Sequence, residues 1–171
     1  MNIPMLGPLR PDQHIPEWLV AEPLEIPFFG NLKLPVTLES HDEADEEEIK
    51  TALTSFLSLD PDDRLAISRY VFQNYRTMAE SVSEEDLDCQ IESEEGVWQH
   101  VHPTGIYISR RHRRDQAIYL VIAANCDWER EHGLQIVYRN GSDLARVSDQ
   151  DGHLTHADAY ALPEEQDRIV D

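Results

Sequence analysis

The chain has 171 residues, of which 40% are hydrophobic, and its 34 acidic and 14 basic residues give a net charge of −20 at pH 7. This length and composition suit one domain with a core of ordinary size and argue against a disordered chain. The charge disfavours nucleic acid and anionic membranes as partners, because both would be repelled, whereas a basic protein would be attracted.

No segment of the sequence indicates a membrane or secreted protein. No apolar run approaches the length of a membrane span, and the N-terminus lacks the basic start and apolar stretch of a secretory signal. The two cysteines, Cys89 and Cys126, do not have CxxC spacing, so reduced thiols are expected. We therefore expect a cytoplasmic protein.

The first 38 residues predict an irregular arm followed by a hairpin. Residues 1–25 contain five prolines and no periodicity, which is typical of an arm lying on the domain. Residues 26–38 place two β-type runs around Gly30-Asn31, a two-residue turn signal. Pro27 and Pro35 place both strands near a sheet edge, because proline cannot donate to the ladder.

Residues 43–80 predict two helices that pack together as an αα-hairpin against the sheet. In the first helix, apolar residues recur from Ile49 at i, i+4, i+7 and i+8. Asp60 and Pro61 have the N-cap and first-turn chemistry with which a second helix begins. A charged and serine-rich segment, residues 81–95, follows as an acidic surface linker.

Residues 97–155 predict an antiparallel meander, because β-type runs follow one another through short turns. The predicted strands are residues 97–102, 105–110, 117–124, 134–139 and 144–148. Residues 156–171 form an acidic tail. The chain therefore predicts a single α+β domain in which the hairpin and the meander make an antiparallel sheet.

The acidic residues are concentrated in the first half of the chain. Residues 39–95 hold 18 acidic and 4 basic residues, whereas residues 96–147 hold 5 acidic and 7 basic residues. A basic partner would associate with such a surface, and the residues expected to bind it are Glu43, Glu46, Glu47 and Glu48. A solvated face that only keeps the protein soluble is the alternative interpretation.

The common catalytic signatures are missing: the sequence contains no GxSxG, GxGxxG, GxxxxGK[ST] or HExxH. The most unusual polar segment is Cys126–Gly133, which links two predicted strands. Thiolate, imidazole and carboxylate are zinc ligands, so this segment and a histidine near the tail predict a pocket or metal site. Its candidate residues are Cys126, Glu129, Glu131, His132 and His153. The sequence predicts no cofactor, and zinc or another divalent metal is the alternative that these ligand types leave open.

Alternatives exist for each of these residues. Cys126 could act as a nucleophile with His132 as its base, although a cysteine after a buried strand is more often a small core residue. His100 and His102 would share one strand face, which is also an acceptable ligand spacing. The basic cluster Arg110–Arg114 suggests phosphate contact, but internal pairing with the acidic helices or linker is favoured.

The strings VWQHVHP and AIYLVIAANCDWEREHGLQIVYRNGSDLARVSDQDGHLT resemble an uncharacterised bacterial domain family with a C-x-W-E-x-E-H-G-L-Q link between two strands. The resemblance covers roughly residues 97–155. It implies a fold unit of small cytosolic proteins without assigned activity, some of which look like immunity proteins. It also implies that Trp128, Glu129, Glu131 and the His132-Gly133 pair act together, with Gly133 adopting a positive φ.

Three functions follow as hypotheses. The favoured one is a non-enzymatic, possibly immunity-like module that binds a basic protein through its acidic face. A metal-dependent or thiol enzyme would use the Cys126–His132 link and His153. A structural or regulatory subunit would oligomerise along an open sheet edge.

Overall fold

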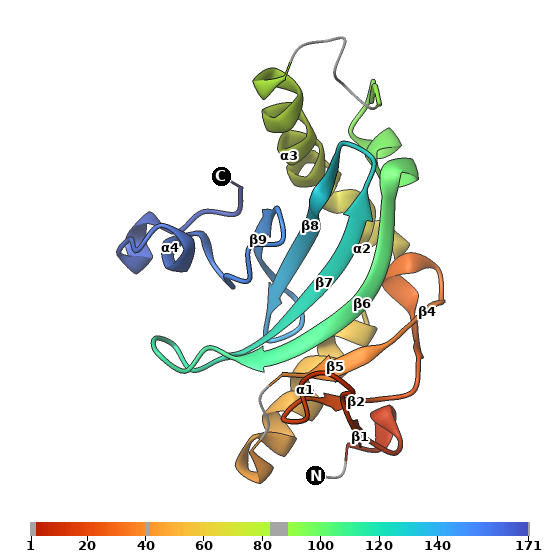
Figure 1. Cartoon of the computed structure of the whole chain (residues 1–171), viewed down its shortest axis with the longest axis vertical. Helices are drawn as coiled ribbons and strands as arrows, with labels where there is room; N and C mark the ends of the chain where they lie inside the picture. Colours follow the sequence, from red (N-terminus) through yellow and green to blue (C-terminus); the bar gives the residue numbers. More distant parts are fainter. Residues whose placement is uncertain (1–2, 40–41, 83–88, 171) are drawn as a thin grey trace.

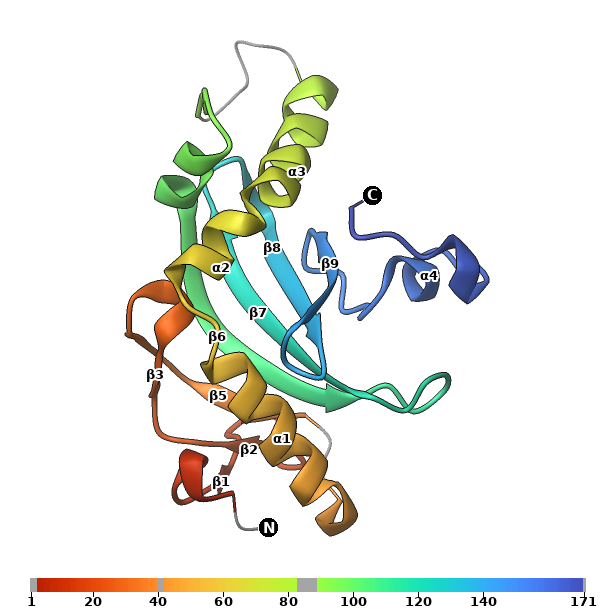
Figure 2. The ribbon, with the colours of Figure 1, turned by 180° about the vertical axis from the view of Figure 1, so that it is seen from behind.

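The computed structural model describes residues 3–39, 42–82 and 89–170, and it shows a curved sheet with helices along one face (Figure 1, Figure 2). The main sheet has seven strands in the order β1-β2-β5-β6-β7-β8-β9, and β3 and β4 form a second, small sheet. The strands are β1 (Arg10–Pro11), β2 (Leu19–Val20), β3 (Leu24–Ile26), β4 (Leu32–Leu34), β5 (Val36–Leu38), β6 (Val101–Arg110), β7 (Ile118–Cys126), β8 (Glu129–Arg139) and β9 (Asp143–Ser148). The helices are α1 (Glu46–Leu57), α2 (Pro61–Ala66), α3 (Ser68–Ser81) and α4 (His156–Ala159), and the 3-10 turns are η1 (Pro4–Leu6), η2 (Pro27–Phe29), η3 (Glu43–Asp45), η5 (Glu95–His100) and η6 (Glu164–Gln166). The predicted α+β class is confirmed.

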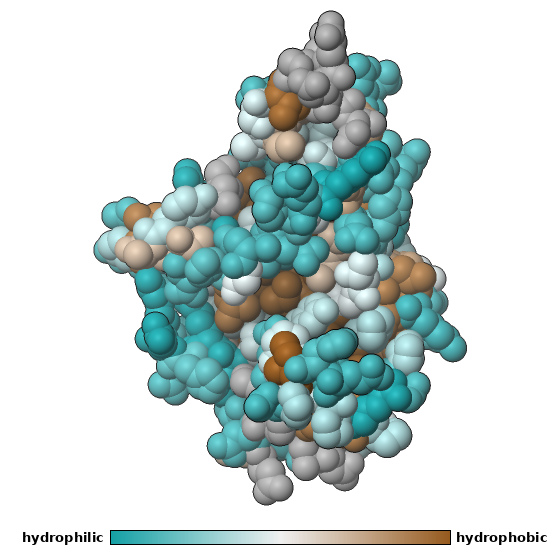
Figure 3. Space-filling view, viewed as in Figure 1, coloured by the Kyte–Doolittle hydropathy of each residue, from teal (hydrophilic) through white to brown (hydrophobic). Residues whose placement is uncertain are grey.

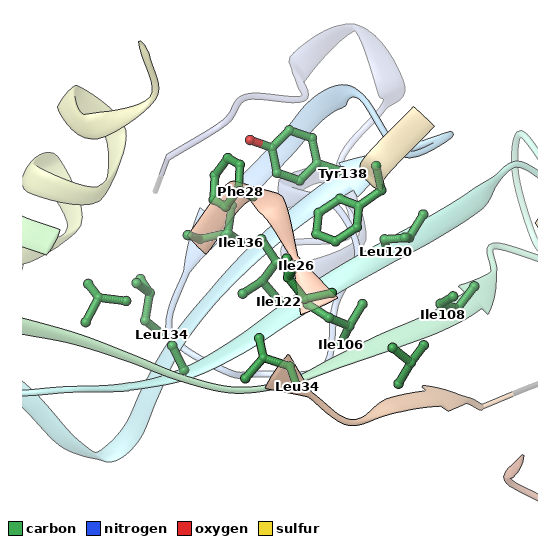
Figure 4. Packing of buried hydrophobic residues seen from close by; sticks show 14 of the residues in the cluster. Ile26, Phe28, Leu34, Ile106, Ile108, Leu120, Ile122, Leu134, Ile136 and Tyr138 are labelled. Carbon is green, nitrogen blue, oxygen red and sulfur yellow. The ribbon is translucent and has the colours of Figure 1, made fainter. Parts of the chain in front are cut away.

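Strands β6 to β9 form the antiparallel meander that the sequence predicts. Alternate side chains on each strand point to opposite faces of the sheet. The side chains on one face contact the helices, and those on the other face point away from them. Figure 4 shows the set that meets the helices, which includes Ile106, Ile108, Leu120 and Ile122 together with Phe28. These five side chains are almost completely buried and belong to one continuous core.

The sheet is not wholly antiparallel, because β5 runs parallel to β6. Adjacent parallel strands cannot be joined by a tight turn and need a long crossover connection. Here α1, α2 and α3 lie within that connection, which carries them over one face of the sheet. The other face, called the open face below, points toward the viewer in Figure 1.

The predicted αα-hairpin is wrong, because the helices follow one another along the sheet instead of lying side by side (Figure 2). Asp60 begins α2 as predicted: its side chain accepts hydrogen bonds from the amides of Asp62 and Asp63, and Pro61 takes the first helical position. Ile67, with φ −98° and ψ 1°, then separates α2 from α3. The interruption turns the chain, so that α1 packs on β7 and α3 reaches η5 and β9.

The arm and the hairpin also differ from the prediction. Gly30 and Asn31, with φ of 65° and 67°, lie in the connection, but Pro27–Phe29 form η2 instead of a strand, so residues 27–31 join β3 to β4 and the predicted two-residue turn is wrong. After Pro35 the chain leaves the small sheet, and β5 joins the main one. The arm is not irregular throughout, since β1 and β2 extend the main sheet beyond β5.

Two predicted strands are one. Residues 97–100 belong to the 3-10 turn η5, and β6 then continues without a turn through Pro103-Thr-Gly105. That tripeptide is a bulge, where the register with β7 shifts by one residue. The Thr104 hydroxyl donates a hydrogen bond to the carbonyl of Ala123 across the bulge, which replaces a ladder contact.

The predicted linker and tail are partly docked on the domain. Within the linker, residues 83–88 lie outside the described ranges, but Ile91 is buried and its amide donates to the Tyr75 hydroxyl. The tail forms α4 and η6, and Val170 pairs with Val147 of β9. Among the described residues, none of the helices combines the length and apolar character required to span a membrane.

Candidate functional site

The polar link Cys126–Gly133 is not a loop between strands, because β7 ends at Cys126 and β8 begins at Glu129. The Cys126 side chain is 2% exposed and lies in the core. Burial raises the pKa of its thiol to about 12, so the reactive thiolate is disfavoured. The geometry therefore supports the core alternative for Cys126 and gives no support to a nucleophile.

Glu129 and Gly133 shape the start of β8. One oxygen of the Glu129 carboxylate accepts hydrogen bonds from the backbone amides of Glu131 (2.9 Å) and His132 (3.1 Å). Gly133 has a φ of 69°, as the resemblance implies, and a Cβ there would lie 2.6 Å from the carbonyl oxygen of Ala124. These residues hold a bulge in which β8 contains more residues than β7. The side chains of Glu131 and His132 are exposed.

Trp128 fastens the tip of the β7–β8 hairpin to α3. Its indole Nε1 donates to Oδ1 of Asn74, and Nδ2 of Asn74 donates to the Asp149 carboxylate. The ring also packs edge-on against Tyr75, with 6.0 Å between centroids. Trp128 thus joins a helix, a hairpin and the end of β9.

Asp127 brings together the two histidines that the sequence singles out. Its carboxylate oxygens lie 2.9 Å from Nδ1 of His100 and 2.8 Å from Nε2 of His102. Partial burial favours a higher pKa for Asp127, but the hydrogen bonds from His102 and His100 outweigh it, and the net pKa is lowered. Asp127 was not predicted as a partner, because the turn that places it beside β6 depends on the bulge in β8.

The five predicted pocket residues do not converge. Cys126 is in the core, Glu129 and His132 are neighbours with 3.5 Å between Oε1 and Nδ1, and His153 belongs to a loop near Asp151. Within residues 3–39, 42–82 and 89–170, no group of three or more His, Cys, Asp and Glu side chains is arranged to hold a metal ion. The described residues therefore do not assemble the predicted zinc site.

The predicted acidic partner surface lies at the start of α1. Arg110 contacts Asp45 at 2.9 Å and Glu48 at 3.2 Å, so Glu48 also helps to hold β6 against the helix. Glu47 has an 81% exposed side chain that lies 3.4 Å from Lys50. Glu46 is half-buried, and the side chain of Glu43 lies outside what the structure describes. We call Glu46–Glu48, at the start of α1, the acidic helix surface.

The basic cluster Arg110–Arg114 pairs internally, as predicted, although mostly with the tail rather than the linker. Arg111 is 5% exposed, and its guanidinium binds Asp158 at 2.7 and 2.9 Å and Glu164 at 2.7 Å. Arg114 binds the same two carboxylates. The tail acids are therefore the counter-charges of Arg111 and Arg114, whereas Arg110 pairs with Asp45 and Glu48.

A groove that the sequence did not predict lies on the open face, with a volume of about 370 Å³. Figure 3 shows hydrophobic surface in a hollow near the middle of this face. Tyr107, Val121 and Gln135 project into the groove because they alternate with the core residues of β6, β7 and β8. The remaining lining residues are Trp18, Glu39, Ser109, Ala123, Gln150, Gly152, His153 and Leu154.

Two features give this groove chemical character. Trp18 and Tyr107 meet at 69° with 6.1 Å between ring centroids, so they form an aromatic corner. Glu39 follows β5, and burial raises the pKa of its carboxyl group, while a hydrogen bond from Ser109 partly offsets the increase. A carboxylate with a raised pKa in a cleft is a common feature of binding sites.

The sequence model of a domain of unknown function, DUF6985, matches residues 5–154. The chain belongs to the DUF6985 family. The predicted resemblance to an uncharacterised domain family is thus confirmed and extends well beyond residues 97–155. No curated protein and no solved structure matches the chain.

The DUF6985 match contains the whole hairpin tip and every residue that lines the groove, from Trp18 to Leu154. It stops before α4 and η6, whose Asp158 and Glu164 hold Arg111. A buried arginine inside the matched segment therefore depends on carboxylates outside it.

Sequence patterns offered little to reveal the groove. Trp18 lies in the arm, Glu39 lies at the end of a short strand, and Tyr107 lies in a predicted strand far from both in the sequence. The one available signal was β7, whose residues are apolar on both faces, which indicates that its open face is also partly covered.

Proposed function

We propose that the protein is a non-enzymatic binding module that recognises a basic protein through the acidic helix surface. One observation carries the proposal: three arginines of the basic cluster form ion pairs within the protein, while residues 42–66 keep a large acidic excess. Arg110, Arg111 and Arg114 are all held in ion pairs. Residues 42–66 contain nine acidic residues and two basic ones.

The acidic helix surface suits rapid association with a basic partner. Opposite charges steer the diffusional encounter, and this steering weakens as salt is added. Several acidic residues of the helix segment serve the fold, because Asp60 and Asp63 form the capping box of α2 and Glu48 contacts Arg110. We therefore assign the recognition role to the start of α1, chiefly to Glu47, whose side chain is 81% exposed.

The proposal includes an immunity-like role, in which the partner would be a basic toxin, and a cytoplasmic location. Cys89 and Cys126 are present as thiols, which supports a reducing compartment. The enzyme hypothesis has weaker support, since its five candidate residues do not converge on one site. Oligomerisation along a sheet edge is disfavoured, because β1 has two residues including Pro11 and β9 is partly covered by Val170.

The test compares two double variants in capture experiments on extracts of the cells that produce the protein, at low and at physiological salt. Glu46→Gln/Glu47→Gln should reduce recovery of a basic partner several-fold and flatten its salt dependence. Glu131→Gln/Glu165→Gln removes the same charge from two other exposed positions and should leave recovery unchanged. Equal losses in both variants, or no loss in either, would contradict the assignment to this surface.

A further inference from the structure

The groove on the open face holds a carboxylate that lacks a balancing cation in the described structure. Within residues 3–39, 42–82 and 89–170, the contact recorded for the Glu39 side chain is the hydrogen bond from the Ser109 hydroxyl. The ion pairs of those same ranges involve other carboxylates, such as Asp151 with Arg146 and Asp158 with Arg111. A half-buried carboxylate without a cation costs free energy, and a bound cation would recover it.

The walls of the groove also favour a cation. Trp18 and Tyr107 stand beside Glu39 in the lining, and the faces of both ring types attract ammonium and guanidinium groups. Two aromatic rings meeting at 69° leave a corner in which a positive group can contact a ring while it pairs with a carboxylate. This combination would select positive over neutral or negative groups.

The floor of the groove is apolar, so a ligand that fits it must carry an apolar group as well as a positive charge. Val121 and Ala123 of β7, with Leu154 of the loop between β9 and α4, form this part of the lining. A volume of about 370 Å³ lies within the range of small-molecule sites. An inorganic cation would leave the apolar surface uncovered, whereas an organic body would bury it.

The wall opposite Glu39 is fixed before any ligand arrives. Arg146 is 1% exposed and binds both oxygens of Asp151 at 2.7 and 2.8 Å. The backbone carbonyl of His153 accepts from Gln135 at 2.9 Å, and the Gln150 amide donates to the carbonyl of Ala124 at 2.8 Å. A preorganised wall lowers the entropy lost on binding.

We propose that this groove binds an organic cation, with an ammonium or guanidinium group at Glu39 and a short apolar body over Val121 and Ala123. The site is separate from the acidic helix surface, which lies on the helix-covered side of the sheet. The cation is carried either by a free small amine or by an arginine side chain of a protein, and the two sources share the same recognition chemistry.

The experiment titrates the full chain with phenethylamine and with N-acetyl-arginine amide, and follows binding by calorimetry and by NMR of the Trp18 indole. The neutral 2-phenylethanol and the anionic phenylacetate serve as matched controls for the apolar body. At least one cation should bind at least tenfold more tightly than both controls. Binding of phenethylamine alone assigns a free amine, and binding of the arginine derivative alone assigns a protein side chain.

Three variants keep the test specific to the groove. Glu39→Gln keeps the size of the side chain and should weaken cation binding at least tenfold, while Glu131→Gln and Glu46→Gln/Glu47→Gln should leave it unchanged. The last variant separates this proposal from the proposed function, because it affects partner capture alone. Failure of both cations to bind, equal binding of 2-phenylethanol, or unchanged binding to Glu39→Gln would overturn the proposal.

Discussion

The two faces of the main sheet are made by the same strands and serve different purposes. On β7, Ile122 lies at 0% exposure against the helices, whereas its neighbour Val121 lines the groove of the open face. The helix-covered face is continuous and apolar, and the open face combines apolar, aromatic and ionisable groups. Strand alternation creates the two faces. The helices cover one face and make it the core (Figure 2), whereas the arm and the loop after β9 cover the other face only in part and leave a groove.

The largest expected effect tests whether the helix-covered face carries the stability. Replacing Ile122 by alanine removes buried methylenes and leaves a cavity in the core, which should lower the free energy of unfolding by about 3 kcal/mol. Val121→Ala at the half-exposed groove floor should cost about 1 kcal/mol or less. Urea denaturation measures both, and equal costs would break the distinction between the faces.

Replacing Arg111 should loosen the tail, because this arginine binds two tail carboxylates. Arg111→Ala removes the buried partner of Asp158 and Glu164 and should cost about 2 kcal/mol, less than a fully buried pair because Glu164 is half-exposed. Hydrogen exchange should increase in α4 and η6. Arg113→Ala, at an exposed position of the same cluster, is the control and should change neither quantity.

The hairpin tip offers a test of its structural role. Gly133→Ala combines a positive φ with a Cβ placed 2.6 Å from the Ala124 carbonyl oxygen, and should cost about 2 kcal/mol. Gly30→Ala has a similar φ of 65° with no atom near its Cβ, so it should cost about 1 kcal/mol. Thermal unfolding compares the two, and a larger loss at Gly30 would contradict the tight packing described at Gly133.

The smallest expected effect is a stabilisation, unlike the losses above, and it concerns Glu39. Burial raises its pKa above the ordinary value of 4.5, so folding disfavours the ionised form, and stability is lost as the pH rises from 4.5 through the raised pKa. Glu39→Gln should therefore stabilise the free protein at pH 7 by less than about 1 kcal/mol and change nothing near pH 4. Destabilisation at pH 7 would show that the carboxylate is already balanced and would weaken the comparison with the core face.

Local features of the fold could be predicted where neighbouring residues decide them. The Asp60-Pro61 start of α2 follows from capping chemistry, and the positive φ of Gly30 and Asn31 follows from residue types that tolerate it. The internal pairing of Arg110–Arg114 followed from the net charge, although the sequence did not name the tail acids. The candidate site was predicted less well. Cys126, at the end of β7, is buried in the core, and His153 lines the groove of the open face instead of lying near Cys126.

By itself, the amino-acid sequence determined the α+β class, the meander of β6 to β9 and the acidic helix segment, since these depend on periodicity and composition. Only the tertiary structure decided the parallel pairing of β5 with β6 and the serial arrangement of the helices. It also decided the groove, where Trp18, Glu39 and Tyr107 meet from three segments. Contacts between distant segments depend on how packed surfaces fit together, and no local pattern in the chain encodes that fit.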